Sequence, residues 1–417
     1  MNIDDPVSRR RFLKVGLAAA GATAAAACRP VAPAPAPPAP APAPTPTTVP
    51  PAPFGERVLV VIEMAGGNDG YSTVVPYTNG AYYSHRPTVA VPANQVLPIT
   101  GDLGWHPNLA RISHRPMAVV EGVGGVNPSE SHFEMMRRWW SGDTNGQSPQ
   151  PTGFFGRICD TVGDPSAPAT GVSLGWGTTP ALVSAQAVTL SMSPYGDASF
   201  PGPGDATLNA TWMAAQRAMA NPDRLESTIM YTARYGAYNA LRFSDVVSSL
   251  PPSQQTYPDT GLGAQLATAV RLIRAGIGTR VVYVPFGGSF DTHENHLATH
   301  SDLMAELDGA LDAFLSELAA LNLTRKVLVA TFSEFGRRAD QNTDGLDHGT
   351  TSVMLLTGAV NPGVYGSRPS WTNLDANGNL VSTVDIGQYY ATLASWFGIH
   401  PGDVLPGNPS PIPGILG

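Results

Sequence analysis

Cysteine is scarce in this chain of 417 residues, which contains only Cys28 and Cys159. If Cys28 is consumed by processing near the N-terminus, the mature chain keeps one thiol and forms no internal disulfide, so its stability depends on core packing and metal binding. Charged residues are also few, at 13% of the chain, and the formal net charge is −8. Because no basic patch stands out, nucleic acid is not expected as a partner.

The N-terminus has the features of an export signal. Residues 8–14 read Ser-Arg-Arg-Arg-Phe-Leu-Lys and precede a Gly/Ala-rich run that ends at Ala27. A charged region, a short apolar stretch and small residues before a cleavage point are typical of a secretory signal and too short to span a bilayer. The paired arginines resemble the twin-arginine motif, which predicts export through the twin-arginine machinery to the periplasm or cell surface.

A proline-rich spacer follows this signal. The Ala-Ala-Ala sequence before Cys28 resembles a lipoprotein cleavage box, with Cys28 as the lipidated residue; ordinary cleavage after an Ala-x-Ala pattern is the alternative. Residues 29–54 are mostly Pro, Ala and Thr, a composition that favours extended polyproline II and cannot bury a core. We therefore expect a signal peptide over 1–28, a linker over 29–54 and a single folded domain over 55–417.

Short β-branched apolar runs in this domain predict buried strands. They are Arg57–Glu63, Met117–Glu121, Arg280–Pro285, Lys326–Phe332 and Val353–Thr357. We expect helices between the last two pairs of strands, the clearest of them at 301–322. Strand–helix–strand connections predict an α/β fold with a mostly parallel central sheet flanked by helices. Residues 160–260 have a weak pattern and predict a loop-rich insertion with two or three helices.

Candidate metal ligands lie next to the predicted strands. They are Asp69, Asp291, His293, Glu334, Asp347 and His348. Parallel sheets place their ligand sites at the carboxyl ends of strands, so we expect these side chains to converge. Each one alone also fits an ordinary role in a turn, a helix cap, an ion pair or a solvated loop. Carboxylates and imidazoles without thiolates suit one or two divalent ions, with zinc favoured over calcium, magnesium or manganese.

A candidate nucleophile, Ser131, lies in the sequence Glu-Ser-His-Phe-Glu at the expected start of a helix. Ser-x-x-Glu is also a capping box, in which the hydroxyl only satisfies the first helical turn. The free N–H groups of a helix start equally favour a phosphate or sulfate group. Both interpretations of Ser131 stay open, and His132 either assists catalysis or packs.

Six motifs in order resemble the exported bacterial family called domain of unknown function 1501. They are Gly66–Gly70, Ser131–Phe133, Gly153–Arg157, Asp291–His293, Ser333–Arg337 and Asp347–Gly349. The resemblance covers residues 56–400 and implies a sulfatase-like domain of the alkaline phosphatase superfamily. The sequence departs from the superfamily in two places. Directly after the late strand, where the superfamily often has an Asp-His pair, this chain has Glu334-Phe335. In the second ligand segment, the expected histidine is either His293 or His296.

The resemblance implies an exported metal-dependent hydrolase of phosphate or sulfate esters, acting on a small-molecule or polysaccharide ester. Ser131 is then the nucleophile, and Arg337 binds the anionic oxygens. No Cys/Ser-x-Pro-x-Arg segment surrounds Ser131, which argues against a formylglycine mechanism and favours phosphoesters. The alternative is a non-catalytic protein of the cell envelope that keeps the fold and binds polysaccharide.

Overall fold

The computed structural model describes most of the chain, namely residues 56–195, 205–221, 228–287 and 289–416. The chain divides into two units, and the fold below is that of the second, residues 51–417. The expected signal peptide with Cys28 and nearly all of the expected linker belong to the first unit and lie outside the described residues. Among the helices of the described part, none is long and apolar enough to cross a membrane.

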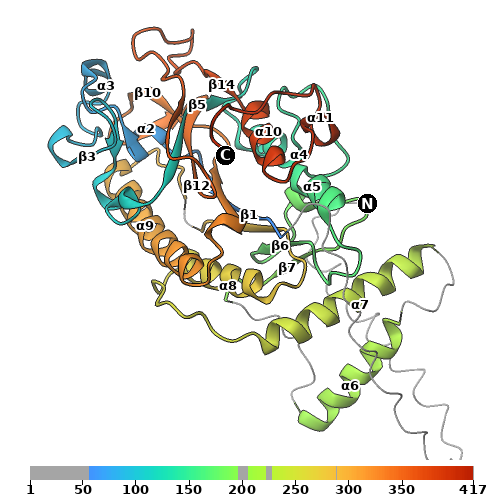
Figure 1. Ribbon diagram of the computed structural model, residues 1–417. Coiled ribbons are helices and arrows are strands. Elements are labelled where there is room, and N and C mark those ends of the chain that lie inside the picture. Colours follow the sequence, from blue (N-terminus) through green and yellow to red (C-terminus); the bar gives the residue numbers. More distant parts are fainter. Residues whose placement is uncertain (1–55, 196–204, 222–227, 288, 417) are drawn as a thin grey trace, which may run out of the picture. The chain divides into compact units, whose positions relative to one another are not determined.

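A central sheet of nine strands organises the described residues (Figure 1). Its strands are β1 (Val58–Glu63), β5 (Met117–Gly124), β6 (Gly171–Leu174), β7 (Thr189–Met192), β8 (Val281–Pro285), β9 (Val327–Phe332), β12 (Thr351–Gly358), β13 (Gly363–Gly366) and β14 (Val384–Asp385). They follow the order β13-β5-β12-β9-β1-β8-β6-β7, and β14 pairs with β5. All neighbours are parallel except β12, which is antiparallel to β5 and β9. The expected mostly parallel sheet is therefore confirmed.

Strand β1 shows why the apolar runs form the centre of this sheet. All six of its residues are buried, and it lies parallel between β8 and β9. Its side chains alternate between two core clusters: Val60 and Ile62 belong to one, Leu59 and Val61 to the other. A parallel strand covered on both faces is apolar at nearly every position, and in β1 the one exception is Glu63 at its carboxyl end.

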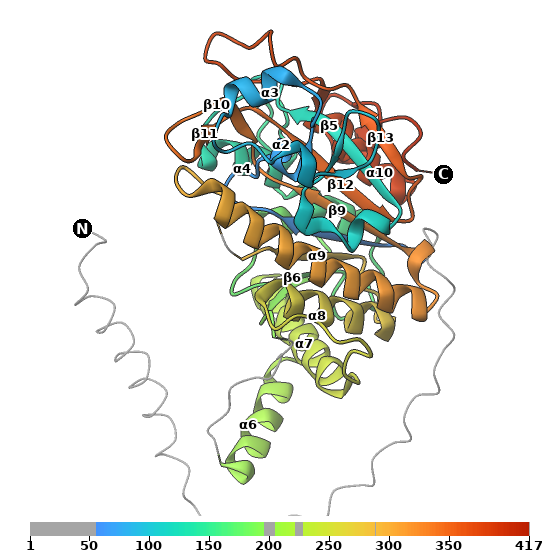
Figure 2. The same cartoon turned by 90° about the vertical axis from the view of Figure 1, so that its left-hand side faces the viewer.

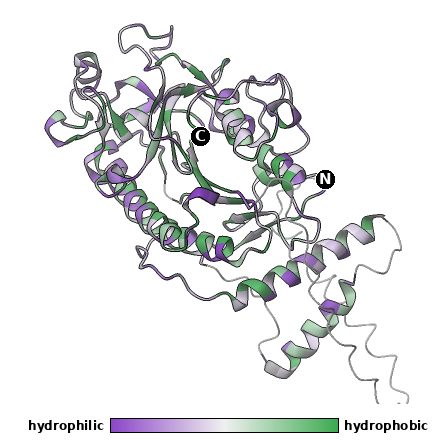
Figure 3. Cartoon of the chain, in the orientation of Figure 1, coloured by the Kyte–Doolittle hydropathy of each residue, from purple (hydrophilic) through white to green (hydrophobic). Residues whose placement is uncertain are grey.

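Helices cover both faces of the sheet. Residues of α8 (Gly261–Ala275) and α9 (His296–Ala320) share the core cluster of Val60, and the two helices lie side by side (Figure 2). Residues of α4 (His132–Ser141), α5 (Phe154–Val162) and α10 (Ile386–Trp396) fill the other cluster. Both hydrophilic and hydrophobic colours occur along α8 and α9, as expected of helices with one buried face (Figure 3).

Further helices and strands complete the fold. They are α2 (Gly70–Thr73), β2 (Val74–Val75), α3 (Gly80–His85), β3 (Leu97–Pro98), β4 (Gly104–Trp105), η4 (Pro180–Leu182), α6 (Ala206–Met219), α7 (Thr228–Ser249), β10 (Arg337–Gln341), β11 (Leu346–His348) and α11 (Pro401–Val404). Residues 160–260 contain α6 and α7 and also β6 and β7, which extend the sheet beyond β8. The pattern of hydrophobic residues did not predict these two strands.

The connection from β9 to β12 differs from the expectation. Residues 333–350 form the antiparallel hairpin β10–β11 in place of the helix that we expected there. Since no crossover returns the chain to the opposite edge, β12 starts where β9 ends and runs in the opposite direction. The residues just before β12 therefore lie at the same edge as the residues that follow the parallel strands.

Candidate metal centre

Five segments meet at the carboxyl edge of the parallel strands. They follow β1, β5, β8 and β9, and the fifth precedes β12. The loops after β1 and β8 approach closely because Gly66 adopts φ +115°, and a Cβ there would lie 2.5 Å from the backbone nitrogen of Asp291. Only glycine permits this backbone conformation without strain.

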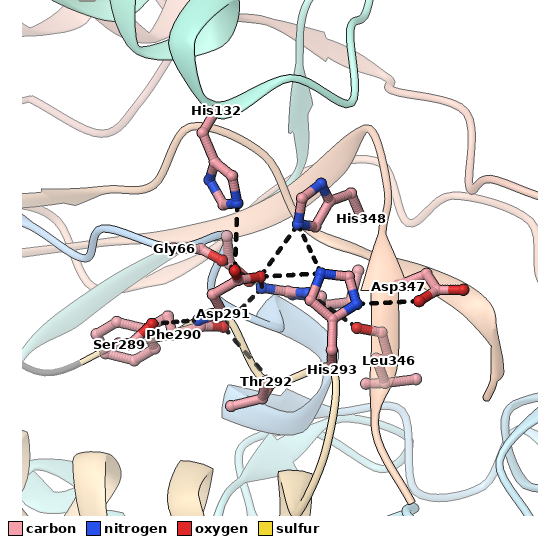
Figure 4. A network of polar contacts seen from close by, with 12 residues as sticks. Gly66, His132, Ser289, Phe290, Asp291, Thr292, His293, Leu346, Asp347 and His348 are labelled. Atoms are coloured by element: carbon pink, nitrogen blue, oxygen red, sulfur yellow. Dashed lines mark hydrogen bonds and ion pairs between the residues drawn. The ribbon is translucent and has the colours of Figure 1, made fainter. Parts of the chain in front are cut away.

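Two histidines and an aspartate form the centre of the site (Figure 4). One potential ligand atom from each of His132, Asp291 and His348 lies within 4.8 Å of the other two. The Asp291 carboxylate is 3.0 Å from His348 Nε2 and 3.5 Å from His132 Nε2. Burial opposes the ionisation of Asp291, but its contacts with Arg337 and the neighbouring imidazoles together outweigh burial and lower its pKa to about 2. The three side chains suit a divalent metal ion.

A third imidazole borders this cluster. His293 Nε2 lies 3.1 Å from Asp291 Oδ1 and 2.9 Å from His348 Nε2. Zinc bonds of about 2.0–2.1 Å in tetrahedral geometry place neighbouring ligand atoms roughly 3.3 Å apart, close to these separations. His293 is therefore a candidate fourth ligand. His296, the alternative at this position, faces a different set of residues, with its Nδ1 2.7 Å from the hydroxyl of Thr292.

The outer nitrogen of each imidazole faces a hydrogen-bond acceptor. Nδ1 of His132 is 2.7 Å from Glu334, Nδ1 of His293 is 3.0 Å from Asp347, and Nδ1 of His348 is 2.8 Å from the backbone oxygen of Glu130. A neutral ring carries one proton, and these acceptors place it on Nδ1. Each Nε2 then offers a lone pair to the centre of the site, which is the arrangement typical of metal-bound histidines.

Carboxylates outnumber guanidinium groups around the cluster. Three carboxylates surround it, those of Asp291, Glu334 and Asp347. Among the described residues, Arg337 is the one guanidinium in direct contact with any of them, and the imidazoles make the other ion-pair contacts. Burial opposes ionisation of Glu334, but the contact with His132 and the backbone N–H groups that donate to this carboxyl together outweigh burial and lower its pKa. If the imidazoles are neutral, two negative charges remain, which either one divalent cation or protonation of imidazoles would neutralise.

Arg337, expected to bind substrate, is instead fully engaged with the protein. Its Nε donates to Gly67 O at 2.8 Å and its Nη1 to Leu346 O at 2.8 Å. Its Nη2 donates to Phe290 O and to the Asp291 carboxylate, both at 2.8 Å, and also to Gly66 O. The side chain is fully buried, so this geometry holds three loops together and leaves no donor facing solvent.

Asp69 is placed apart from the imidazoles of the cluster. It is buried, and Arg86 donates to both of its oxygens, at 2.6 and 3.2 Å. His296 Nε2 lies 3.4 Å from the same carboxylate. Burial opposes the ionisation of Asp69, but Arg86 and His296 together outweigh burial and hold its pKa well below the usual range. A carboxylate paired on both oxygens with a buried guanidinium is occupied by a structural interaction.

Ser131 caps α4 and is exposed to solvent. Its hydroxyl accepts from the backbone N–H of Glu134 at 3.5 Å, a long capping bond. The adjoining His132 is the first residue of the helix and contributes its imidazole to the cluster. The hydrogen bond that His132 donates to the Glu334 carboxylate is the main reason why the pKa of His132 is raised. Ser131 therefore lies next in sequence to a candidate metal ligand, with its hydroxyl open to solvent.

Two supporting groups had no signal in the sequence. The backbone oxygen of Glu130 orients His348, while its carboxylate accepts from Arg338 and Asn379 at 2.9 Å each. Arg86 reaches Asp69 from the end of a short helix, with no pattern to relate the two. A backbone acceptor or a loop arginine is not distinguishable from its neighbours in a single sequence.

Comparison with known proteins places the chain in a family. No curated protein matches it in sequence. Similar solved structures include the lipoteichoic acid synthase LtaP from Listeria monocytogenes (8% identity, 84% of this chain and 74% of that chain, TM-score 0.38). They also include the C-terminal periplasmic domain of EcEptC from Escherichia coli (10%, 88% and 90%, 0.38) and the PsFucS1 sulfatase from Pseudoalteromonas sp. (11%, 82% and 68%, 0.38). At these sequence identities and TM-scores, the activities of these proteins cannot be assigned to this chain. Residues 132–405 match the family model described as protein of unknown function (DUF1501), and the chain belongs to that family.

Proposed function

We propose that the protein is an exported metal-dependent hydrolase of phosphate or sulfate esters, with phosphoesters favoured. One observation carries this proposal: His132, His293 and His348 each have Nδ1 tied to an oxygen acceptor and Nε2 directed at Asp291. Lone pairs that face one another at such distances repel, and either a metal ion or a proton among them removes this repulsion; the three outward-facing Nδ1 acceptors favour the metal ion. The excess negative charge of the surrounding carboxylates supports the same conclusion.

Zinc is the ion that this ligand set fits best. Three imidazoles and one carboxylate are typical of zinc, and no thiolate is among them. The proposal assigns His132, Asp291, His293 and His348 as ligands of a single ion. It assigns Glu334 and Asp347 to orienting these ligands, and it leaves Asp69 outside the set. A divalent ion in this position stabilises negative charge on an ester oxygen and lowers the pKa of a nearby hydroxyl.

Residues of α4 supply the remaining chemistry. The Ser131 hydroxyl forms a bond to the phosphorus of the ester while the bond from phosphorus to the alcohol oxygen breaks, and the alcohol leaves with a proton. Water then hydrolyses the seryl ester and restores Ser131. The free N–H groups of the first turn of α4, which starts at His132, face negative charge favourably and bind the ester oxygens that Arg337 cannot reach.

The proposal is tested by metal analysis and turnover of the purified protein. We expect about one equivalent of zinc, and hydrolysis of aryl phosphate or aryl phosphodiester, with aryl sulfate tested alongside. His348→Ala and Asp291→Asn lose the ion and the activity. Ser131→Ala keeps the ion and loses turnover. His114→Ala is the matched control, because His114 is exposed and lies outside the cluster.

Two outcomes contradict the proposal in different ways. If His348→Ala and Asp291→Asn retain the ion as the parent does, the metal centre is wrongly assigned. If the parent binds the ion but turns over none of these esters, the chain is a non-catalytic envelope protein with a structural metal.

A further inference from the structure

Two exposed aromatic rings lie at the same edge of the sheet as the metal centre. Trp176 follows β6 and Tyr195 follows β7, and these strands are parallel to β8, which leads to Asp291. The side chains are 83% and 67% exposed, and their ring centroids are 6.3 Å apart at an interplanar angle of 59°. Strands in a sheet are spaced by about 4.8 Å, so the turn with Trp176 begins roughly one strand away from the end of β8. The segment from β8 to Asp291 then turns toward the loop after β1, where Phe290 N–H donates to Ala65 O.

The turn that carries Trp176 is held in place by the protein. Ser191 Oγ donates to the backbone oxygens of Gly175 and Gly177, both at 2.9 Å. The buried Gln265 donates to Leu174 O at 2.8 Å and to Pro285 O at 2.7 Å, which ties the ends of β6 and β8 together. Trp176 therefore projects into solvent from a fixed backbone. A rigid, exposed aromatic ring binds a partner at a low cost in conformational entropy.

A pocket of about 250 Å³ adjoins this turn. It is lined by Ser173, Thr178, Thr179, Leu182, Val183, Ser184, Thr189 and Leu190. Five of these eight residues carry a hydroxyl group, and Thr178 comes two residues after Trp176. Pockets for drug-sized ligands are about 300–1,000 Å³, so this pocket suits a single small ring with several hydrogen-bonding groups.

The lack of charged residues in residues 171–195 argues against several classes of binding partner. Residues 171–195 contain no Asp, Glu, Lys, Arg or His. An anionic lipid surface, a nucleic acid or a charged peptide would need basic or acidic residues here. Aromatic faces beside a set of uncharged hydroxyls complement a polyhydroxylated ring, which has both apolar C–H faces and many hydrogen-bonding groups.

We infer that Trp176, Tyr195 and the adjoining pocket bind the neutral sugar rings of a saccharide chain. The location, at the edge that also holds the metal centre, makes the saccharide the part of the substrate that carries the ester. This last step rests on the proposed function, whereas saccharide binding itself does not.

The test is binding of neutral saccharides to the purified protein, with and without removal of metal by EDTA. Probes are a soluble glucan, a galactomannan and a chitin hexamer, measured by affinity electrophoresis and calorimetry. We expect at least one probe to bind both metal-loaded and metal-free protein. Trp176→Ala weakens that binding at least ~tenfold, as loss of an aromatic anchor does, and Trp176→Phe restores most of it. Tyr231→Ala, an exposed aromatic on α7, is the matched control and leaves binding unchanged.

The outcomes separate this inference from the proposed function. If no probe binds, or if Trp176→Ala binds as tightly as the parent, the inference is refuted even if aryl phosphate is hydrolysed. If the protein binds phosphatidylglycerol vesicles through Trp176 and no saccharide, the surface is a membrane contact. If saccharide binds but no ester is turned over and no metal is found, the inference stands and the hydrolase proposal fails.

Discussion

The buried pair of Asp69 and Arg86 tests whether Asp69, which the sequence predicts to be a metal ligand, has a structural role instead. Asp69 follows β1 at a position where a metal ligand is expected, yet Arg86 binds both of its oxygens. We predict that Asp69→Ala keeps the metal content of the protein and lowers its stability. The reason is that the substitution leaves the fully buried Arg86 guanidinium without its counter-ion.

The magnitude follows from the geometry of the pair. The closest nitrogen and oxygen are 2.6 Å apart, and both side chains are almost completely buried. With charge centres about 4 Å apart and an effective dielectric constant of about 20, the lost attraction is about 4 kcal/mol. Breaking a buried pair by removing one partner typically costs about 3–5 kcal/mol, in agreement. For a urea m-value of about 3 kcal/mol/M, the unfolding midpoint falls by roughly 1 M.

Urea unfolding and metal analysis are measured on the same preparations. Arg86→Met should cost a similar amount, because it leaves the Asp69 carboxylate buried and unpaired. The double variant Asp69→Leu/Arg86→Met should lose clearly less than the sum of the single variants, since it leaves no unpaired charge. If Asp69→Ala instead releases the ion and leaves the midpoint unchanged, Asp69 is a ligand and the reasoning is refuted.

Three further substitutions test neighbouring groups. Glu334→Gln should weaken zinc binding about 10- to 100-fold in a competition titration, because it loses the charged acceptor that orients His132; unchanged affinity would show that this contact is incidental. Burial raises the pKa of Glu63 from 4.5 to about 7. Between these two pH values the folded chain therefore keeps a proton that the unfolded chain has released, so the free energy of unfolding falls as the pH rises through this range. Glu63→Gln cannot ionise and should gain about 3 kcal/mol relative to the parent between pH 4 and pH 8 in urea unfolding, whereas a pH-independent difference would contradict the assignment. Arg337→Lys should lower the free energy of unfolding by more than about 3 kcal/mol, because several buried carbonyl oxygens lose their donors; a folded variant with only a raised KM would restore Arg337 as a substrate-binding residue.

The parts of the fold that the sequence predicted are those with the strongest local signal. All five predicted apolar runs are strands, because a strand buried on both faces is apolar at most of its positions. The pattern missed β6 and β7, whose sequences Gly-Val-Ser-Leu and Thr-Leu-Ser-Met mix small, polar and apolar residues. It also missed the direction of β12, because direction depends on whether the preceding connection is a crossover or a hairpin.

The site was predictable where a side chain lies directly beside a strand end. Asp291 and His348 come together because their segments both reach the carboxyl edge of the sheet. Asp69 shows the limit of this argument, since its role depends on which residue faces it, and Arg86 comes from a separate segment. The orientation of His348 depends on the backbone oxygen of Glu130, which no residue type reveals.

The position of His348 depends on the hairpin that replaces the expected helix. His348 lies opposite Arg337 in the β10–β11 pairing, and Arg337 bonds to the backbone of the loops after β1 and β8 as well as to Asp291. One buried guanidinium thus fixes the hairpin that carries His348 against the loop that carries Asp291. Because Arg337 holds both segments through protein groups, we expect Asp291 and His348, the proposed ligands, to keep this arrangement with or without the ion. A centre built in this way would not need the ion for its folding, in contrast to small metal-folded domains, and its affinity would not be reduced by the cost of ordering these loops.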